Sequence, residues 1–223
     1  MKTIAVISQK GGTGKTTLTV HLAVSAARAG LVSLIMDTDP QATASTWHSW
    51  RGENSEPDVI DCGSPALLPK KLAQAADLGA EIAFIDTPPH ADIMAREACR
   101  AADILLIPCR PRAFDLDAVR TTADLAAASQ KPAWLIFMAG PTNAKLVYQE
   151  ATELVQSFGL RVAPVMLPER AAFHHSVGQG KTAVEIEPNG KAGDDMLALW
   201  HWTREQVNLQ PRKHVNKKKE SAV

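Results

Sequence analysis

The sequence predicts an α/β fold in which a mostly parallel β-sheet is covered by helices on both faces. Short apolar runs typical of buried parallel strands alternate with longer segments of helical periodicity along most of the chain. With 45% hydrophobic and 22% charged residues, the 223-residue chain also has the composition of a globular domain that buries a core without disulfides. These observations predict one domain, residues 1–210, followed by a short tail, residues 211–223.

The elements follow in order along the chain. The expected strands are six short apolar runs, at 3–8, 32–37, 82–86, 104–108, 134–138 and 161–166. The expected helices occupy 15–28, 67–76, 91–102, 116–128, 145–158 and about 193–207. Ala29-Gly30 supplies the small residue and the glycine that commonly follow a helix end. Each strand is therefore followed by a segment long enough to cross back over the sheet.

The charges are spread unevenly, although 24 Lys and Arg balance 24 Asp and Glu. The tail carries five basic residues and one acidic residue, so its charge is +4 and that of the preceding 210 residues is −4. The balance excludes a histone-like protein that coats nucleic acid with its whole surface. Two interpretations of the tail stay open, a solvated disordered end and an electrostatic arm for phosphate backbones.

Targeting and redox signals place the chain in the cytoplasm. No run of 18 apolar residues is present, and the N-terminus lacks the apolar stretch of a signal peptide. The three cysteines, Cys62, Cys99 and Cys109, are odd in number and form no CxxC pair. They predict reduced thiols, not a disulfide framework or a zinc site.

Residues 9–17 carry the strongest functional signal. They read Gln-Lys-Gly-Gly-Thr-Gly-Lys-Thr-Thr and lie between an expected strand and an expected helix, the context that a phosphate-binding loop requires. Glycines let backbone N–H groups approach phosphate oxygens, and the positive end of the following helix faces the same phosphates. Lys15 is placed to reach the β- and γ-phosphates, and the Thr16 hydroxyl to ligate Mg²⁺. The expected nucleotide ligands are Lys10, Gly11, Gly12, Thr13, Gly14, Lys15, Thr16 and Thr17.

The loop departs from the general pattern G-x-x-x-x-G-K-[ST], because Gln9 replaces the first glycine and Lys10 follows it. The form K-G-G-x-G-K-T resembles the deviant Walker A motif of the ParA/MinD superfamily of P-loop ATPases, and most closely the small ParA/ParF-type plasmid partition proteins. The resemblance covers about residues 2–205. It implies that the nucleotide is ATP, that ATP closes a sandwich homodimer, and that Lys10 reaches the partner's phosphates.

Two apolar strands end in carboxylates at the edge where parallel sheets bind ligands. Ile82 to Asp86 has the Walker B pattern, which assigns Asp86 to the Mg²⁺ shell together with Thr16. The other strand ends in Asp37-Thr38-Asp39-Pro40. Its D-x-D spacing predicts side chains on opposite faces of a continuing strand, unless the chain turns at Pro40.

The similarity of D-x-D-P-Q to the family's motif implies that Asp37 lies near the Mg²⁺ shell and that Asp39 orients the attacking water. The alternative is that both aspartates cap a helix beginning near Ala42. The resemblance also places residues 167–173 near the adenine, which adds Pro168 to the nucleotide contacts. Lys10, Lys15 and Asp39 are then the expected catalytic residues.

The resemblance implies a slow, partner-stimulated ATP hydrolase that acts in plasmid or chromosome partition. The ATP dimer would bind non-specific duplex DNA, and a centromere-binding, ParB-like partner would trigger hydrolysis and release. Because the chain begins at its first strand, operator recognition is not expected. The expected phosphate contacts in the domain are Arg170, Lys181, Lys191 and Arg204.

The alternative is a MinD-like or cargo-positioning ATPase that acts on a membrane or a protein assembly. A membrane anchor of this type needs an amphipathic helix, but the tail offers only Val215 for insertion before its terminal Ala222-Val223. Stable membrane insertion is therefore not expected, and a cytoplasmic, nucleoid-associated protein is favoured. A cargo other than DNA stays open, because the cargo is chosen by the partner.

Overall fold

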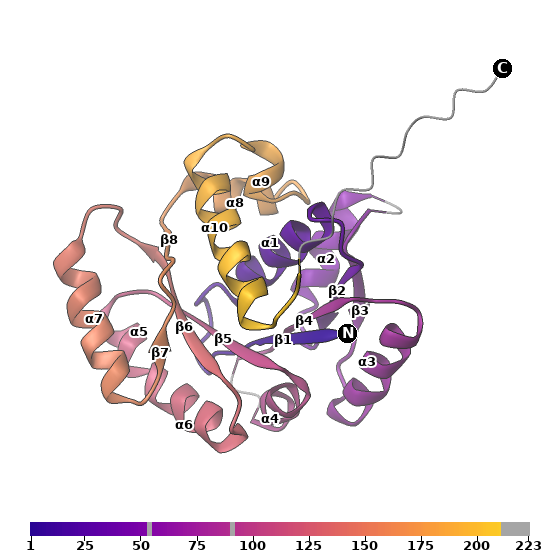
Figure 1. Ribbon diagram of the computed structural model, residues 1–223, viewed down its shortest axis with the longest axis horizontal. Helices are drawn as coiled ribbons and strands as arrows, with labels where there is room; N and C mark the ends of the chain where they lie inside the picture. Colours follow the sequence, from indigo (N-terminus) through magenta and orange to yellow (C-terminus); the bar gives the residue numbers. More distant parts are fainter. Residues whose placement is uncertain (53–54, 90–91, 211–223) are drawn as a thin grey trace.

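A parallel β-sheet forms the centre of the molecule (Figure 1). The computed structural model describes residues 1–52, 55–89 and 92–210. The strand order is β3-β2-β4-β1-β5-β6-β7, with β8 paired to β6, and every pairing in the described ranges is parallel. The strands are β1 (Lys2–Val6), β2 (Ser33–Asp37), β3 (Asp58–Asp61), β4 (Ile82–Asp86), β5 (Ile104–Cys109), β6 (Ala133–Gly140), β7 (Arg161–Val162) and β8 (Leu167–Pro168).

Helices cover both faces of the sheet (Figure 1), as the sequence predicts. One face carries α1 (Lys15–Arg28), α2 (Thr43–Arg51), α8 (Ala171–Val177), α9 (Ala183–Ile186) and α10 (Lys191–Gln206). The other carries the 3-10 turn η1 (Pro65–Leu67), α3 (Leu68–Asp77), α4 (Asp92–Ala101), α5 (Ala113–Asp117), α6 (Val119–Ser129) and α7 (Lys145–Ser157). Along β1, Ile4 and Val6 enter the first core and Ala5 enters the second, so the central strands are buried on both sides.

Most predicted elements are confirmed to within a few residues, including the end of α1. Gly30 adopts a φ of 84°, and its N–H donates to the Ala27 carbonyl at 2.9 Å. The Leu31 N–H reaches the Ala26 carbonyl at 3.2 Å, which completes a glycine-terminated helix end. The predicted helix 91–102 is present as α4, and Ala91 itself lies outside the described residues.

Other elements differ from the prediction. The expected strand 161–166 shortens to β7, because Pro164 has no N–H with which to continue the ladder. The expected helix 116–128 begins at Ala113 and divides at Ala118 into α5 and α6. The helix near Ala42, which the sequence suggested only as an alternative, is present as α2, whereas the short elements β3, β8, α8 and α9 were not predicted.

The tail, residues 211–223, lies outside the described residues, so the domain boundary at 210 stays a prediction. Within the described part of the chain, no helix combines the length and the apolar character needed to cross a bilayer. The thiols of Cys62, Cys99 and Cys109 are free and buried. Burial raises the pKa of Cys99 to about 11 and that of Cys109 to about 12, so both remain protonated at neutral pH.

Candidate nucleotide-binding site

Three neighbouring strands end level with one another at the carboxyl edge of the sheet. Val6 of β1 pairs with Asp86 of β4, and Asp37 of β2 pairs with the same Asp86. Two threonine hydroxyls fix these ends, since Thr87 donates to the Val6 carbonyl at 2.8 Å and Thr38 to the Asp86 carbonyl at 2.6 Å. The phosphate loop and both carboxylate motifs are thereby brought to one place.

The predicted phosphate loop connects β1 to α1. Two of its glycines require positive φ, 71° at Gly12 and 97° at Gly14, which explains their residue type. Gly14 is the residue that precedes α1, and no side chain caps that helix. No acidic residue occupies the first turn of α1 either. The first amides of α1 are therefore directed at the loop without an anion of their own, as a phosphate site needs.

Lys15 lies inside this loop with only 7% of its surface exposed. Its Nζ donates to the carbonyl oxygen of Lys10 at 3.3 Å, which closes the loop on itself. Burial lowers the pKa of Lys15, and the charges of Asp86 and Asp39 oppose that shift. A buried ammonium whose hydrogen bond in the described part of the chain goes to a neutral carbonyl is suited to an anionic ligand such as a phosphate.

Thr16 and Asp86, both assigned to the metal from the sequence, are in direct contact. The Thr16 hydroxyl donates to Oδ2 of Asp86 at 2.6 Å. Asp86 is fully buried, and this burial raises its pKa to about 7. The Thr16 hydrogen bond opposes the shift, while the neighbouring charges of Asp37 and Asp39 add to it. A divalent cation beside Asp86 would favour its ionised form.

The oxygen donors around Thr16 fit Mg²⁺. Hydroxyl and carboxylate oxygens are its preferred ligands, and it usually retains water and phosphate ligands as well. The described ranges contain no set of three or more His, Cys, Asp or Glu that could enclose a metal. The residues that would hold the ion are Thr16, Asp37 and Asp86, which stay a prediction as metal ligands.

The chain leaves β2 at Asp37 and turns at Asp39, whose carbonyl accepts the Ala42 N–H at 2.8 Å, and the charges of both aspartates act on Asp86. Oδ2 of Asp37 accepts both the N–H and the hydroxyl of Ser45, each at 2.8 Å. Oδ1 of Asp39 accepts the Gln41 N–H at 2.9 Å. Both carboxylates therefore order the start of α2 while remaining close enough to act on Asp86. Ser45 was missed because a contact across eight residues has no local sequence signal.

Lys10 extends away from the inner side of its own loop. Its Nζ forms an ion pair with Oδ1 of Asp115 at 2.9 Å and donates to the Phe114 carbonyl at 3.1 Å. The two acceptors belong to α5 of the same chain. The sequence assigned both lysines to phosphates, but the structure separates their side chains. The Lys15 ammonium lies inside the loop, whereas the Lys10 ammonium contacts α5.

Pro168, the expected adenine contact, lies beside the loop in a crevice that also includes Gly14, Thr17 and Met138. Its volume is about 30 Å³, well below the roughly 300 Å³ from which small-molecule pockets begin. Met138 crowds this crevice, since its Cε would lie 3.1 Å from a Cβ placed at position 14. Adenine would fit here only after rearrangement of that flexible side chain, and Pro168 stays a prediction.

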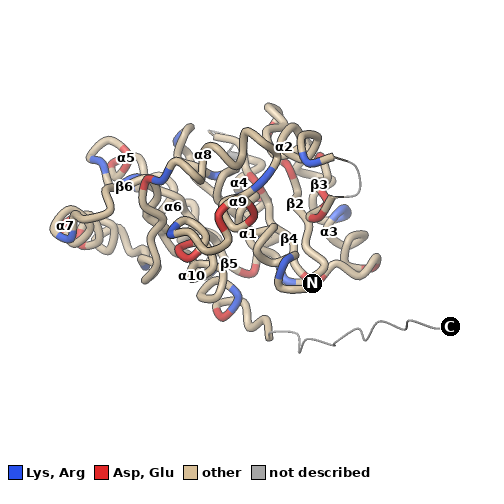
Figure 2. The backbone as a smooth tube through the Cα atoms, turned by 90° about the horizontal axis from the view of Figure 1, so that it is seen from above, with Lys and Arg blue, Asp and Glu red and all other residues tan. Residues whose placement is uncertain are grey.

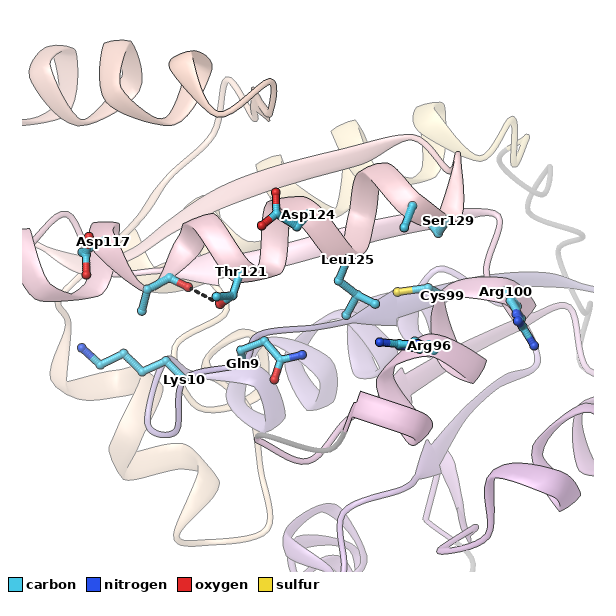
Figure 3. A pocket seen from close by; sticks show the side chains of 12 residues that line it. Gln9, Lys10, Arg96, Cys99, Arg100, Asp117, Thr121, Asp124, Leu125 and Ser129 are labelled. Atoms are coloured by element: carbon cyan, nitrogen blue, oxygen red, sulfur yellow. Dashed lines mark hydrogen bonds between the residues drawn. The ribbon is translucent and has the colours of Figure 1, made fainter.

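A larger cavity of about 1030 Å³ opens on the other side of the loop, between α4 and α6. Figure 3 shows Gln9 and Lys10 of the loop among its lining residues, together with Leu125 of α6 and Cys99 of α4. Arg96 and Arg100 line it from α4, and Asp117 and Asp124 line it from α5 and α6. Its position outside the glycine-rich turn separates it from the phosphate site.

The basic residues predicted to contact DNA do not form one cluster. Figure 2 shows basic and acidic positions interspersed along the backbone in that view. Arg170 pairs with Asp195 at 2.6 Å, so its guanidinium already has a carboxylate partner. Lys191 begins α10 and Arg204 lies in its last turn, which separates these two by most of a helix. The tail cations lie outside the described residues.

Comparison with known proteins places this site in a family. The profile of the CobQ/CobB/MinD/ParA nucleotide binding domain matches residues 4–184. The chain is 24% identical over 202 residues to the maintenance of carboxysome distribution protein A of Halothiobacillus neapolitanus, covering 87% of this chain and 92% of that protein. It is 25% identical over 225 residues to the chromosome-partitioning ATPase Soj of Thermus thermophilus, covering 84% and 89%.

A solved structure supports the same assignment of the fold. The structure of pNOB8 ParA bound to nonspecific DNA aligns with a TM-score of 0.70 at 15% identity, over 93% of this chain and 98% of that one. The profile match extends over the strands that carry the phosphate loop and both carboxylate motifs. The chain therefore belongs to the CobQ/CobB/MinD/ParA family of nucleotide-binding ATPases.

Proposed function

We propose that this protein is a Mg²⁺-dependent ATPase that partitions DNA, closing into a homodimer with ATP and binding duplex DNA without sequence preference. The observation that carries the nucleotide site is the buried ammonium of Lys15 at the uncapped start of α1, beside the Thr16–Asp86 contact. A ParB-like adaptor would stimulate hydrolysis and release the DNA. In the cell, the protein would then be cytoplasmic and associated with the nucleoid.

The residues of the site suit phosphoryl transfer to water. The α1 amides and Lys15 would bind and orient the phosphates, and bound Mg²⁺ would neutralise charge on the transferred group. Asp39, which is half-exposed and close enough for its charge to act on Lys15, would orient the attacking water. Asp37 would bind water of the metal's shell while it also accepts the hydrogen bonds of Ser45 at the start of α2.

The partition role is supported by the similarity to Soj, which is named for chromosome partitioning, and by the ParA neighbour that binds nonspecific DNA. A second candidate is the positioning of a protein assembly, because the relative from Halothiobacillus neapolitanus is named for carboxysome distribution. Both candidates share the ATP site and differ in the cargo.

The test is binding to a random-sequence duplex with ATP, with ADP and without nucleotide, over a range of salt concentrations. We expect binding only with ATP, with an affinity that falls steeply as salt rises, since several phosphates are neutralised. A Lys15→Gln variant serves as the control that retains the fold but loses the nucleotide. Binding in no state would reject DNA partition, and a pull-down with assembly proteins would then test the second candidate.

A further inference from the structure

We propose that Asp115 is a positioning residue that holds Lys10 on its own chain, and that this contact opposes nucleotide-dependent dimerisation. The inference rests on the proposed function for the dimer and on the geometry of α5 for the contact itself. The Lys10 ammonium has two acceptors there, Oδ1 of Asp115 at 2.9 Å and the Phe114 carbonyl at 3.1 Å.

The pair is better sheltered than an ordinary surface ion pair. The Asp115 side chain is 12% exposed and that of Lys10 is 35% exposed. Asp115 is also fixed by its backbone, because its N–H donates to the Arg112 carbonyl at 2.9 Å. A fixed carboxylate with little solvent access loses more when its cation leaves than an exposed, mobile one does.

The loop side of the contact is equally well defined. The Gln9 N–H donates to the Thr122 hydroxyl of α6 at 3.2 Å, which ties the start of the loop to the same layer of helices. The Lys10 carbonyl faces inward and accepts the Lys15 ammonium, whereas the Lys10 side chain runs outward along the edge of the α4–α6 cavity (Figure 3). Lys10 therefore cannot serve a second protomer without first leaving Asp115.

Two such contacts must break in a symmetric dimer, one on each protomer. The ion pair thus sets a threshold of ATP and protein concentration below which the chain stays monomeric. Replacing Asp115 by Asn keeps the shape of the side chain and removes its charge. If the pair contributes near the upper end for exposed ion pairs, its loss favours the free lysine about fivefold and the dimer about 25-fold.

The first experiment measures the contact alone. The Lys10 amine is acylated with an N-hydroxysuccinimide acetate reagent, without nucleotide, and the rate is followed by peptide mass spectrometry. We expect Asp115→Asn to increase the Lys10 rate about fivefold, and Asp115→Glu to restore a slow rate. Asp117→Asn is the matched control, since that exposed carboxylate lies two residues away in α5 and has no ion pair in the described structure.

The second experiment measures dimerisation by sedimentation velocity with Mg²⁺ and a non-hydrolysable ATP analogue. We expect Asp115→Asn to dimerise at lower protein concentration than the wild type, with Asp117→Asn unchanged. Thermal melting confirms that each variant is folded. An unchanged Lys10 acylation rate overturns the proposal whatever the dimer does, and a faster rate without a shift in dimerisation overturns the coupling. If neither the wild type nor any variant dimerises, both the coupling and the sandwich dimer are rejected. The acylation rates still test the Lys10–Asp115 contact, because they are measured without dimerisation.

Discussion

Asp37 and Ser45 are joined twice, because one carboxylate oxygen of Asp37 accepts both the N–H and the hydroxyl of Ser45 at 2.8 Å. The aspartate ends β2 and the serine lies in the first turn of α2. Asp37 is 1% exposed, and its other oxygen, Oδ1, accepts the Asp39 N–H at 3.3 Å. The start of α2 and the predicted metal shell therefore share one carboxylate.

The first prediction concerns that shared carboxylate. Ser45→Ala removes the hydroxyl bond and leaves the amide bond, so we expect the free energy of unfolding to fall by about 1 kcal/mol. The difference in melting temperature between the protein with Mg²⁺-ATP and the protein with ATP alone should also be smaller, because Asp37 is less well held. Ser49→Ala is the control, since Ser49 is exposed on α2 and its hydroxyl donates to the Thr46 carbonyl within the same helix. Equal effects of the two substitutions would contradict the prediction.

A second prediction separates nucleotide binding from hydrolysis. Lys15→Gln removes the buried ammonium, so we expect ATP binding to fall below detection in a fluorescent-nucleotide titration. Asp39→Ala leaves the loop intact and should bind ATP with nearly normal affinity while hydrolysing it at least about 100-fold more slowly. Phosphate release measures the second effect. Normal hydrolysis by Asp39→Ala would show that another group orients the water.

The third prediction follows from the raised pKa of Asp86. With a folded pKa of about 7 against an ordinary 3.8, the carboxyl is mostly protonated at pH 6.5 in the absence of metal. Its stability contribution is therefore present below pH 4 and is lost as pH rises toward 7. Divalent metal favours the ionised form, so binding of Mg²⁺-ATP at pH 6.5 should release roughly half a proton or more from this group.

Calorimetry in buffers of different ionisation enthalpy measures the number of protons released when Mg²⁺-ATP binds. Asp86→Asn has no carboxyl to ionise, so subtracting its proton release from that of the wild type isolates Asp86. The difference should vanish at pH 8.5, where the carboxylate is already ionised. A difference that is as large at pH 8.5 as at pH 6.5 would assign the proton to another group.

The fourth prediction concerns His21, which is fully buried in α1. Its Nδ1 donates to the Thr17 carbonyl at 2.8 Å, and its Nε2 accepts the Ala183 N–H at 3.1 Å, which fixes the neutral ring. Burial lowers its pKa from 6.5 to about 4. Because the unfolded state binds this proton first, stability should fall by roughly 3 kcal/mol between pH 6.5 and pH 4.

Urea unfolding at several pH values measures how the free energy of unfolding depends on pH. His21→Gln should be less stable than the wild type at pH 7 but lose less stability on acidification. His201→Gln is the control, because His201 is exposed on α10. Parallel pH profiles for wild type and His21→Gln would exclude His21 as the source of the acid sensitivity.

The success and failure of the sequence predictions have a physical basis. Central strands such as β4 are continuous apolar runs, and a loop with Gly12 and Gly14 needs no tertiary information to be recognised. Helix α2 has no such signal, because its order comes from distant contacts. Trp47 donates to the Lys181 carbonyl at 3.2 Å, and Arg51 pairs with Glu185 at 2.8 Å. Lys10 is likewise visible in the sequence, whereas its partner 105 residues away is not.

The last prediction tests whether the packing of α2 against the segment around Gly180 supports the site. Gly180 has a φ of 65°, and a Cβ there would lie 2.5 Å from the Trp50 carbonyl carbon and 2.6 Å from the Arg51 nitrogen. Backbone atoms cannot move aside as a side-chain end can, so Gly180→Ala must push α2 away. We expect the free energy of unfolding, measured with urea, to fall by more than about 2 kcal/mol. Since α2 carries Ser45, the Mg²⁺-dependent stabilisation by ATP should weaken as well.

Gly178 supplies the matched control two residues away. Its φ is −62°, and the nearest atom to an added Cβ is the His175 carbonyl oxygen at 3.7 Å. Gly178→Ala should therefore be neutral or stabilise the fold by up to about 1 kcal/mol, because it restricts the unfolded chain. If the two variants unfold at the same urea concentration, the close approach of residue 180 to α2 is not what holds that helix against the domain. A loss confined to Gly180→Ala, with a weaker response to Mg²⁺, would connect the α8–α9 turn to the metal site through α2.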